Sequence, residues 1–596
     1  MILVVAMLIY GFYQYRNLSD SERKEQKKIK NEIGQIAENL IDIEKGMYMG
    51  RGVDLEGQSG ELENVYIPWG DLNSHFMCFG TTRQGKTRLL AFMMRQTIKK
   101  GDHVIFIEPK GAEEQEGMSW LYQYAFENES IKDTVYWSPE HPDMSLKINL
   151  LYGQSDEEAT STVIGAMKVD EEFFEDIANE ILMTVLPALT FIEETIDELF
   201  LEIMERIEYN KAMIINPINR LNKRMLGSYF NPDLHDVEDN ILQFMLSHHD
   251  GDTLMQKRIN EQYLKVTSES KKSNPTPIRK FVTFADLARY ANLSDIQKLK
   301  EEVQAALQSH KMSLSREKYH EGEMALANLT KLSEEDSGFF SKVTKSYSVT
   351  MSRLSTGNVG KLLCDSKVNI LKDMFYEKGR RVIMAVQPFP MKYEKAANMS
   401  IKMLMSMMNN LMSNVGVSGK MGENRIHVFI DEAGSVANSQ MLSLINKGGG
   451  LGLSLYMYSQ SFADYKDTLG EEGATIMADN ANNKGFFLVN DNDSAETISG
   501  IIGSQKKGDI TYGSSEGTTS RTQGKAVAEE LVPASLVMRL QKMTYVLKTG
   551  SRVFMMAAPF QRDPMIELSF PYTDFIGKSE TSKQFMQDHI KYTQTT

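Results

Sequence analysis

Short apolar runs alternate with longer amphipathic stretches along much of the chain, a pattern typical of an open parallel sheet covered by helices. Four runs have the length and apolarity of buried strands, and each ends in glycine or polar residues: 75–79, 104–107, 426–430 and 453–458. The stretch TRLLAFMMRQTIKK after the first run has the three- and four-residue apolar spacing of a helix. Two later strand-like runs, 545–547 and 552–558, are expected to complete the same sheet.

A long helical region interrupts this alternation. More than 300 residues separate the second of these strands from the third, far more than one strand-helix unit needs. Helix formers dominate residues 171–345, with apolar residues at three- and four-residue spacing and little strand-like alternation. We therefore predict an inserted all-α domain there. A methionine run at 403–412 also has helical spacing, and we interpret it as core filling rather than as a ligand surface.

The first fifteen residues carry no charge, and six basic residues follow between positions 16 and 30. As a helix the apolar segment would measure roughly 22 Å, short of the ~30 Å of a hydrocarbon core. We predict a membrane anchor at 1–16, truncated or marginal in length, with the basic cluster keeping the bulk of the chain in the cytoplasm. Acidic residues interleave with these basic ones, so a charged, solvated helix over 17–47 is a second interpretation, compatible with the first.

Composition limits the function classes. The 596 residues carry a formal net charge of -14, which excludes a protein coated in positive charge but not a local basic lining for nucleic acid. The two cysteines, Cys78 and Cys364, lie far apart and outside any metal-ligand spacing, so neither a disulfide framework nor a zinc site is expected. Cations lie near aromatic residues at two places, where they are candidates for nucleic-acid contact or ordinary surface charge: Lys271, Lys272, Arg279, Lys280 and Phe281, and Lys342, Lys345, Tyr347 and Arg353.

The strand at 75–79 leads into a complete phosphate-binding motif, G-x-x-x-x-G-K-[ST]: Gly80, Thr81, Thr82, Arg83, Gln84, Gly85, Lys86 and Thr87. Glycines let backbone N–H groups close around phosphate oxygens at the N-terminus of the following helix. Lys86 is placed to neutralise the β- and γ-phosphates, and the Thr87 hydroxyl can ligate Mg²⁺. We predict that Gly80 to Arg88 binds ATP with Mg²⁺.

Three other strand ends carry polar residues that suit the same chemistry. The strand at 426–430 ends in Asp431 and Glu432, which matches a Walker B pair: Asp431 to hold Mg²⁺ and Glu432 to act as general base. Gln460 follows the strand at 453–458 and is the candidate sensor of the γ-phosphate, with a plain surface turn as the alternative. Glu108 and Lys110, after the strand at 104–107, are candidates for the same crevice or for a simple turn.

Together these elements resemble the TraD/TrwB-like coupling proteins of conjugation, which are relatives of the FtsK/HerA DNA-pumping ATPases. The resemblance covers most of residues 48–570. GTTRQGKTR at 80–88 is similar to the P-loop of the TraD subgroup on integrative conjugative elements, and EPKG at 108–111 resembles that family's DPKG. The stretch 446–470, NKGGGLGLSLYMYSQSFADYKDTLG, looks like the family segment that contains the sensor glutamine, and NNKGFFLVNDNDSAETISGIIG is similar to the strand and helix that follow it.

The resemblance implies an α/β fold with a RecA-like P-loop core, an inserted all-α domain and a short anchor in the bacterial inner membrane. It also implies a hexameric ring with DNA-stimulated ATP hydrolysis, which feeds relaxase-bound, single-stranded DNA to the channel proteins of a type IV secretion system. The expected division is 1–16 anchor, 17–47 linker helix, 48–170 first nucleotide-binding part, 171–345 all-α domain, 346–575 second nucleotide-binding part and 576–596 tail.

One position departs from the family pattern. Many relatives carry an arginine eleven residues before the sensor glutamine, thought to reach the γ-phosphate of the neighbouring subunit, but this chain has Gly449 there. The trans-acting cation is left between Lys447 and an arginine elsewhere, such as Arg353; a lysine would be the poorer bidentate partner. Two alternative functions stay open: an ATPase that energises protein-only secretion, and a nucleotide-gated receptor platform that does not translocate its cargo.

Overall fold

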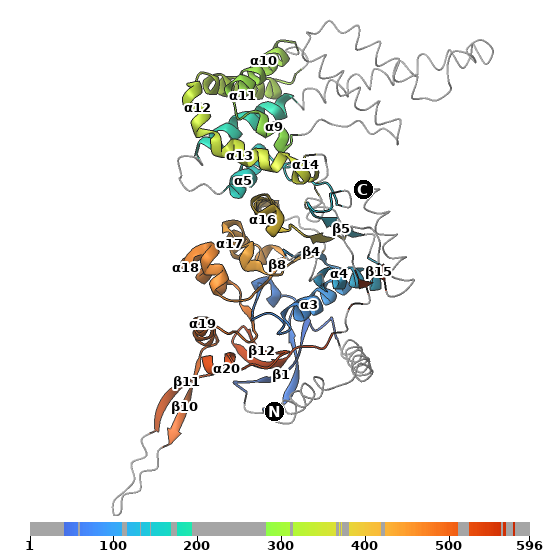
Figure 1. Cartoon of the computed structure of the whole chain (residues 1–596), viewed down its shortest axis with the longest axis vertical. Coiled ribbons are helices and arrows are strands. Elements are labelled where there is room, and N and C mark those ends of the chain that lie inside the picture. Colours follow the sequence, from blue (N-terminus) through green and yellow to red (C-terminus); the bar gives the residue numbers. More distant parts are fainter. Residues whose placement is uncertain are drawn as a thin grey trace, which may run out of the picture. The chain divides into compact units, whose positions relative to one another are not determined.

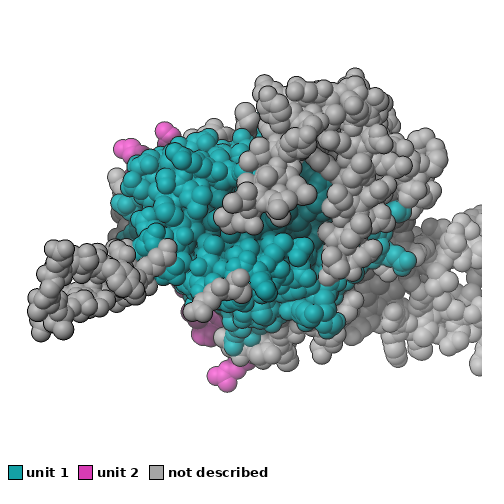
Figure 2. All heavy atoms as spheres, turned by 90° about the horizontal axis from the view of Figure 1, so that it is seen from below, with its two compact units in different colours: residues 1–146, 370–596 teal, residues 147–369 magenta. Residues whose placement is uncertain are grey.

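The computed structural model describes most of two compact units. One unit comprises residues 1–146 with 370–596, and the other comprises 147–369 (Figure 2). The described residues are 41–57, 60–109, 116–130, 133–142, 145–167, 176–192, 282–309, 314–364, 369, 371, 381–418, 424–510, 524–561, 564, 566–567 and 576–577. The predicted anchor at 1–16, most of the linker helix, Lys110 and the cationic residues between 271 and 281 lie outside these ranges.

A large mixed sheet organises the first unit (Figure 1). Its strands lie in the order β2-β1-β13-β12-β9-β3-β8-β7-β4-β6-β5. Their bounds are β1 Met47–Asp54, β2 Leu62–Ile67, β3 Phe76–Phe79, β4 His103–Ile107, β5 Thr134–Trp137, β6 Ile383–Val386, β7 Ile426–Ile430, β8 Leu453–Ser459, β9 Asn483–Phe486, β12 Thr544–Thr549 and β13 Arg552–Ala557. The run from β5 to β9 is parallel, whereas β12, β13, β1 and β2 continue the sheet in antiparallel pairs.

The parallel strands are buried at every residue, as expected when helices cover both faces of a sheet. The helices of this unit are α3 Lys86–Lys100, α4 Glu116–Glu127, α16 Pro390–Ser418, α17 Ser439–Lys447, α18 Ala463–Asn480, α19 Asn492–Ile502 and α20 Ala534–Val537. Short 3-10 turns lie at Asp71–Ser74, Ala433–Ser435 and Gly449–Leu451, and two-stranded pairs join β10 Ser504–Ile510 to β11 Gly524–Glu530 and β14 Ile566–Glu567 to β15 Ile576–Gly577. Five methionines of α16 are buried, which confirms the interpretation of 403–412 as core: Met403, Met405, Met407, Met408 and Met412.

The described elements of the second unit are helices: α5 Asp156–Ala166, α9 Phe284–Arg289, α10 Leu293–Ser309, α11 Arg316–Ser333, α12 Ser337–Val343, α13 Lys345–Ser355 and α14 Gly357–Leu363. A capping box at Ser155 and Glu158 begins α5, which satisfies backbone N–H groups of its first turn. Helices α10 and α11 pack closely at Gly322, where a Cβ atom would lie 2.8 Å from Leu307. The described elements within 171–345 are thus helices, while the inserted all-α domain and its boundaries stay a prediction.

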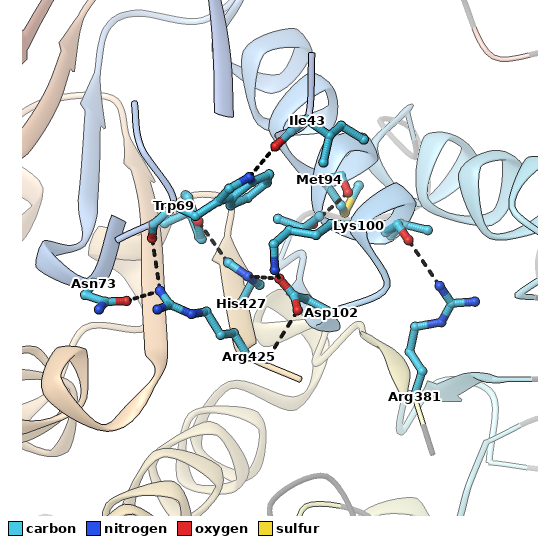
Figure 3. A network of polar contacts seen from close by, with 12 residues as sticks. Ile43, Trp69, Asn73, Met94, Lys100, Asp102, Arg381, Arg425 and His427 are labelled. Carbon is cyan, nitrogen blue, oxygen red and sulfur yellow. Dashed lines mark hydrogen bonds and ion pairs between the residues drawn. The ribbon is translucent and has the colours of Figure 1, made fainter. Parts of the chain in front are cut away.

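The amino ends of the parallel strands carry a buried polar network (Figure 3). His427 lies between Asp102, 3.0 Å from its Nε2, and the Tyr456 hydroxyl, 2.9 Å from its Nδ1. Lys100 donates to the same carboxylate at 2.7 Å, and the backbone N–H of Arg425 donates to it at 3.3 Å. Burial opposes ionisation of Asp102, but the His427 and Lys100 contacts outweigh it and lower the pKa of Asp102 to about 2.

Two more histidines are buried at the same edge. The Nδ1 atom of His75 accepts the Leu455 N–H at 3.1 Å, and its Nε2 lies 2.9 Å from the Ile445 carbonyl. The Nδ1 atom of His103 accepts the Val382 N–H at 3.1 Å. Burial lowers the pKa of both rings to about 4, because a charged ring loses its hydration inside the protein. Both histidines are therefore neutral parts of the framework.

Within the described ranges, no helix combines the length and the apolarity that a membrane crossing requires.

Candidate nucleotide site

The order of the strands brings the predicted site residues to one edge of the sheet. Strand β8 lies between β3 and β7, with Phe79 paired to Ser459 and Ile430 paired to Met457. The segments that follow these three strands therefore leave the sheet side by side at its carboxyl edge, where ligands of open parallel sheets bind. These segments carry the phosphate-binding motif, the acidic pair and Gln460.

The phosphate-binding loop has the backbone conformation that its glycines predict. Gly80 and Gly85 have φ values of 154° and 115°, and Gly85 is the N-cap of α3. A Cβ atom at Gly80 would lie 2.5 Å from the Cβ of Phe487, so packing also requires glycine there. Arg83 has a φ of 62°, which costs strain for a residue with a side chain. The loop is thus held in an anion-binding curve at a helix N-terminus.

Two segments that sequence reasoning missed hold this loop in place. The Thr81 N–H donates to the Leu488 carbonyl at 2.8 Å, just after β9. The Met543 N–H, just before β12, donates to the Gln84 carbonyl at 3.0 Å. Met543 has a φ of 67°, and its sulfur would lie 2.6 Å from a Cβ atom at Gly85. No motif points to Met543, because its role depends on the pairing of β9 with β12.

Lys86, Thr87 and Arg88 begin α3 immediately after the loop. The Lys86 side chain is buried and its ammonium donates to the Gly80 and Thr81 carbonyls, so it lies folded over the loop. Thr87 is half-buried on the first turn. The Arg88 guanidinium donates to the Gln561 carbonyl at 3.2 Å and lies over the Trp120 ring, which binds it to other parts of the protein. Thr82 is exposed within the loop.

Asp431 and Glu432 leave β7 in different environments. Asp431 is buried, and its Oδ1 accepts the Glu432 N–H at 3.1 Å. Glu432 has the left-handed values φ 48° and ψ 46°, a strained conformation for glutamate that directs the chain sharply into the next turn. Burial raises the pKa of the Cys78 thiol on β3; the positive charge of Lys86 opposes this rise and the negative charge of Asp431 adds to it. Lys86 and Asp431 are thus both close enough to Cys78 to affect its pKa.

Gln460 contacts Glu432 directly. Its amide Nε2 donates to Glu432 Oε1 at 3.2 Å, so the predicted sensor and the predicted base are brought together. The Asp464 carboxylate accepts the N–H groups of Gln460 at 3.1 Å and Ser461 at 3.0 Å. A serine followed three residues later by an acidic residue, as at Ser461 and Asp464, is typical of the start of a helix. This pattern was not used to predict α18 from the sequence.

The turn after Glu432 is tied to β8 and α18 through Gly434. The Gly434 N–H donates to the Ser459 hydroxyl at 3.0 Å, and the Gly434 carbonyl accepts the Thr468 hydroxyl at 3.0 Å. A Cβ atom at Gly434 would lie 2.5 Å from the Cβ of Asp464. The turn that presents Glu432 is therefore fixed on both sides.

Glu108 and the positions considered for a trans-acting cation were the remaining candidates. Glu108 is buried, and a Cβ atom at Gly117 on α4 would lie 2.9 Å from its Oε1. A Cβ atom at Gly449 would lie 2.0 Å from the Asn73 carbonyl oxygen, so the backbone packs too closely there for any side chain. Lys447, at the end of α17, is exposed. The arginine of the family pattern is thus sterically incompatible with this position as it is packed here.

The donor set fits a magnesium nucleotide. The loop from Gly80 to Gly85 presents backbone N–H groups at a helix N-terminus, with the Lys86 ammonium folded over it. Thr87 and Asp431 supply a hydroxyl and a carboxylate oxygen, the hard ligands that Mg²⁺ takes in phosphate sites. Within the described ranges, no cluster of histidine, cysteine and carboxylate side chains suits a metal bound by protein alone. Thr87 and Asp431 are the residues that would hold Mg²⁺ beside the phosphates.

Comparison with known proteins bears on the fold and on the family resemblance. Residues 425–542 match the family model described as the TraM recognition site of TraD and TraG. A search of curated proteins found no match. The unbound monoclinic form of the bacterial conjugative coupling protein TrwBdeltaN70 is 12% identical at a TM-score of 0.50, and the alignment covers 92% of this chain and 93% of that one.

Two further solved structures are also similar. TrwB in complex with the non-hydrolysable GTP analogue GDPNP is 11% identical, with a TM-score of 0.49 and coverage of 92% of this chain and 94% of that one. VirB4 of Thermoanaerobacter pseudethanolicus is 11% identical, with a TM-score of 0.38 and coverage of 87% and 97%. At such identities, the TrwBdeltaN70 match bears on the fold: the α/β, RecA-like core is confirmed. With the match at 425–542, the resemblance to TraD/TrwB-like proteins is confirmed as well, and the TraD subgroup stays a prediction.

Proposed function

We propose that this TraD/TrwB-like chain is an ATPase that couples a relaxase-DNA substrate to a type IV secretion channel and pumps the DNA during conjugation. The observation that carries the ATPase assignment is the meeting of four elements at one sheet edge: the loop from Gly80 to Thr87, Asp431, Glu432 and Gln460. The match of residues 425–542 to the TraD and TraG model supports the role in conjugation.

The proposed chemistry assigns one task to each residue. Backbone N–H groups of the loop and the Lys86 ammonium bind the β- and γ-phosphates. Thr87 and Asp431 would hold Mg²⁺, and the ion would supply positive charge beside the phosphates. Glu432 takes the proton of the attacking water as general base, and Gln460 bonds the γ-phosphate and orients Glu432. The strained backbone of Glu432 and the two bonds to Gly434 keep the carboxylate in one place.

The remaining parts of the proposal rest on the family. TrwB structures bind ADP with Mg²⁺ and nucleotide analogues, which supports ATP and Mg²⁺ as cofactors here. We further propose a homohexameric ring on the inner membrane, anchored by residues 1–16, with most of the chain in the cytoplasm. Its partners are DNA, a relaxase or relaxosome component and the channel proteins.

The test measures ATP hydrolysis by the full chain with and without single- and double-stranded DNA, beside Lys86→Ala. DNA is expected to stimulate hydrolysis, and Lys86→Ala is expected to remove basal and stimulated activity. Unchanged activity in Lys86→Ala would refute the site. Hydrolysis without any DNA effect would favour an energiser of protein secretion, and tight ATP binding without turnover at every protein concentration would favour the receptor platform.

A further inference from the structure

The helical unit contains two kinds of charged surface. On α10 and α11 and beside them, cations are matched by acids: Lys298 and Arg289 contact Asp295, and Lys331 contacts Glu180. Residues 337–363, which form α12, α13 and α14, contain four basic residues and no acidic one, in a chain whose net charge is -14. This second surface, made by Lys342, Lys345, Arg353 and Lys361, is called the basic helical surface below.

The basic helical surface has no acidic partner among the described residues, because none of its four cations takes part in an ion pair there. Lys342, Lys345 and Lys361 are exposed and Arg353 is half-buried. The helices α12, α13 and α14 follow one another along the chain, and α13 contacts both of the others (Figure 1). Like charges that gather without counter-charges repel one another, so an anionic partner that neutralises them would gain free energy.

The pattern along α13 places its charges together. Tyr347, Met351 and Leu354 are buried, whereas Lys345, Val349 and Ser352 are exposed, so the helix turns one face to the core and a polar face outward. Lys345 and Arg353 are eight residues apart, or ~12 Å along a helix. Hydroxyl side chains lie exposed among the cations and can donate to phosphate oxygens: Ser341, Ser346, Ser352 and Thr356.

We propose that the basic helical surface binds the phosphate backbone of DNA, a step that rests on the proposed function and names where its cargo first contacts the chain. An acidic protein fits the surface less well, because stable protein interfaces need large apolar or aromatic anchors. Val349 is the one exposed large apolar side chain of these helices in the described part of the chain. Short hydroxyls between well-spaced cations suit phosphates instead.

The surface binds without reading sequence. Tyr347, the aromatic residue that the sequence placed beside these cations, is buried, and its hydroxyl donates to the Leu287 carbonyl at 3.0 Å. It cannot stack on bases, so of the residues in this cluster only the cations are open to nucleic acid. Contacts limited to phosphates give an affinity that falls steeply with salt and is the same for different sequences.

The experiment measures DNA binding by the full chain at several salt concentrations, with labelled single- and double-stranded DNA. Lys342→Gln/Lys345→Gln is compared with Lys298→Gln/Lys331→Gln, which removes the same charge from exposed, ion-paired lysines of the same unit. The first variant is expected to bind DNA more weakly at low salt and to reduce the salt slope by about 2, while the control keeps the wild-type slope. Thermal unfolding verifies that both variants fold.

Equal affinity and slope for the wild type and Lys342→Gln/Lys345→Gln would overturn the basic helical surface and leave the ATPase proposal intact. No DNA binding by the wild type at any salt concentration would overturn both the surface and the DNA cargo. A competition with polyglutamate tests whether the surface prefers DNA or acidic protein. If polyglutamate displaces DNA at equal charge concentration and itself binds more tightly, the surface recognises acidic protein and the proposal fails.

Discussion

The two edges of the main sheet differ: the amino edge holds a network of buried polar groups, and the carboxyl edge holds strained backbone. At the amino edge, Asp102 and His427 are bonded to each other, and Asp102 also accepts from Lys100 and Arg425 (Figure 3). His75 and His103 accept backbone N–H groups. At the carboxyl edge, Arg83, Glu432 and Met543 hold positive φ values around the phosphate-binding loop. His75 also has a positive φ, but both of its ring nitrogens are bonded.

The difference teaches which residues support the fold and which shape the candidate nucleotide site. A network in which every buried polar group has a hydrogen-bond partner makes a sheet more rigid. Breaking it costs free energy, because removing one group leaves its partners buried without a hydrogen bond. Strain in the backbone persists where the surroundings over-determine it, and it concentrates at sites that bind or react. We therefore expect substitutions at the amino edge to change stability, and those at the carboxyl edge to change hydrolysis.

The largest expected effect is at the carboxyl edge. Glu432→Gln keeps the size of the side chain and the contact with Gln460 but removes the base, so kcat is expected to fall by about 10²–10⁴-fold. ATP affinity and the unfolding midpoint should stay close to those of the wild type. Rapid-quench hydrolysis beside binding of a fluorescent nucleotide measures both, and a kcat within threefold of the wild type would remove Glu432 from the base role.

The matching change at the amino edge is Asp102→Ala. It leaves the Lys100 ammonium, the Arg425 N–H and the His427 ring without their carboxylate, so the free energy of unfolding should fall by about 3–5 kcal/mol. The folded fraction should hydrolyse ATP with an unchanged KM. Denaturant unfolding and kinetics below the melting temperature test this. A stable variant with a large loss of kcat would contradict the division between the edges.

Lowering the pH should destabilise the fold through the buried histidines of the amino edge. His75 and His103 have pKa values of about 4 in the folded chain, below the ordinary 6.5, so between these values the unfolded chain binds more protons. Stability is therefore full above pH 6.5 and is lost as the pH falls toward 4, by up to roughly 3 kcal/mol for each ring. Denaturant titrations from pH 7 to 4 measure the slope, and His103→Gln should reduce it. A flat profile would show that the rings are not held neutral.

The motifs of the carboxyl edge could be predicted because the chemistry fixes residue types at short spacing, as from Gly80 to Thr87. The contacts that hold the loop in place could not be predicted. Leu488 and Met543 reach the loop through the pairing of distant strands, which no local sequence pattern encodes. The same limit applies to Tyr347, whose spacing beside cations resembles a stacking platform until the helix packs it inward. Likewise, the sequence does not show why position 449 is a glycine, whereas the structure shows that the Asn73 carbonyl leaves no room for a side chain there.

The smallest effect concerns the tether that fixes the turn of Glu432. Thr468→Val removes the hydroxyl bond to the Gly434 carbonyl, worth about 1 kcal/mol, so kcat should fall by about fivefold with KM unchanged. Thr475→Val on the same helix is the matched control, because the Thr475 hydroxyl bonds only the Glu471 carbonyl of its own helix among the described contacts.

Thr468→Ser keeps the hydroxyl and should restore the wild-type kcat, which separates the bond to Gly434 from the loss of packing. If Thr468→Val and Thr475→Val lower kcat equally, helix stability explains the effect, and Gly434 is no tether. If Thr468→Val instead raises KM alone, the turn acts on ATP binding rather than on Glu432. A selective loss of kcat would show that the carboxyl edge depends on how firmly its strained turn is held, beyond the identity of the base.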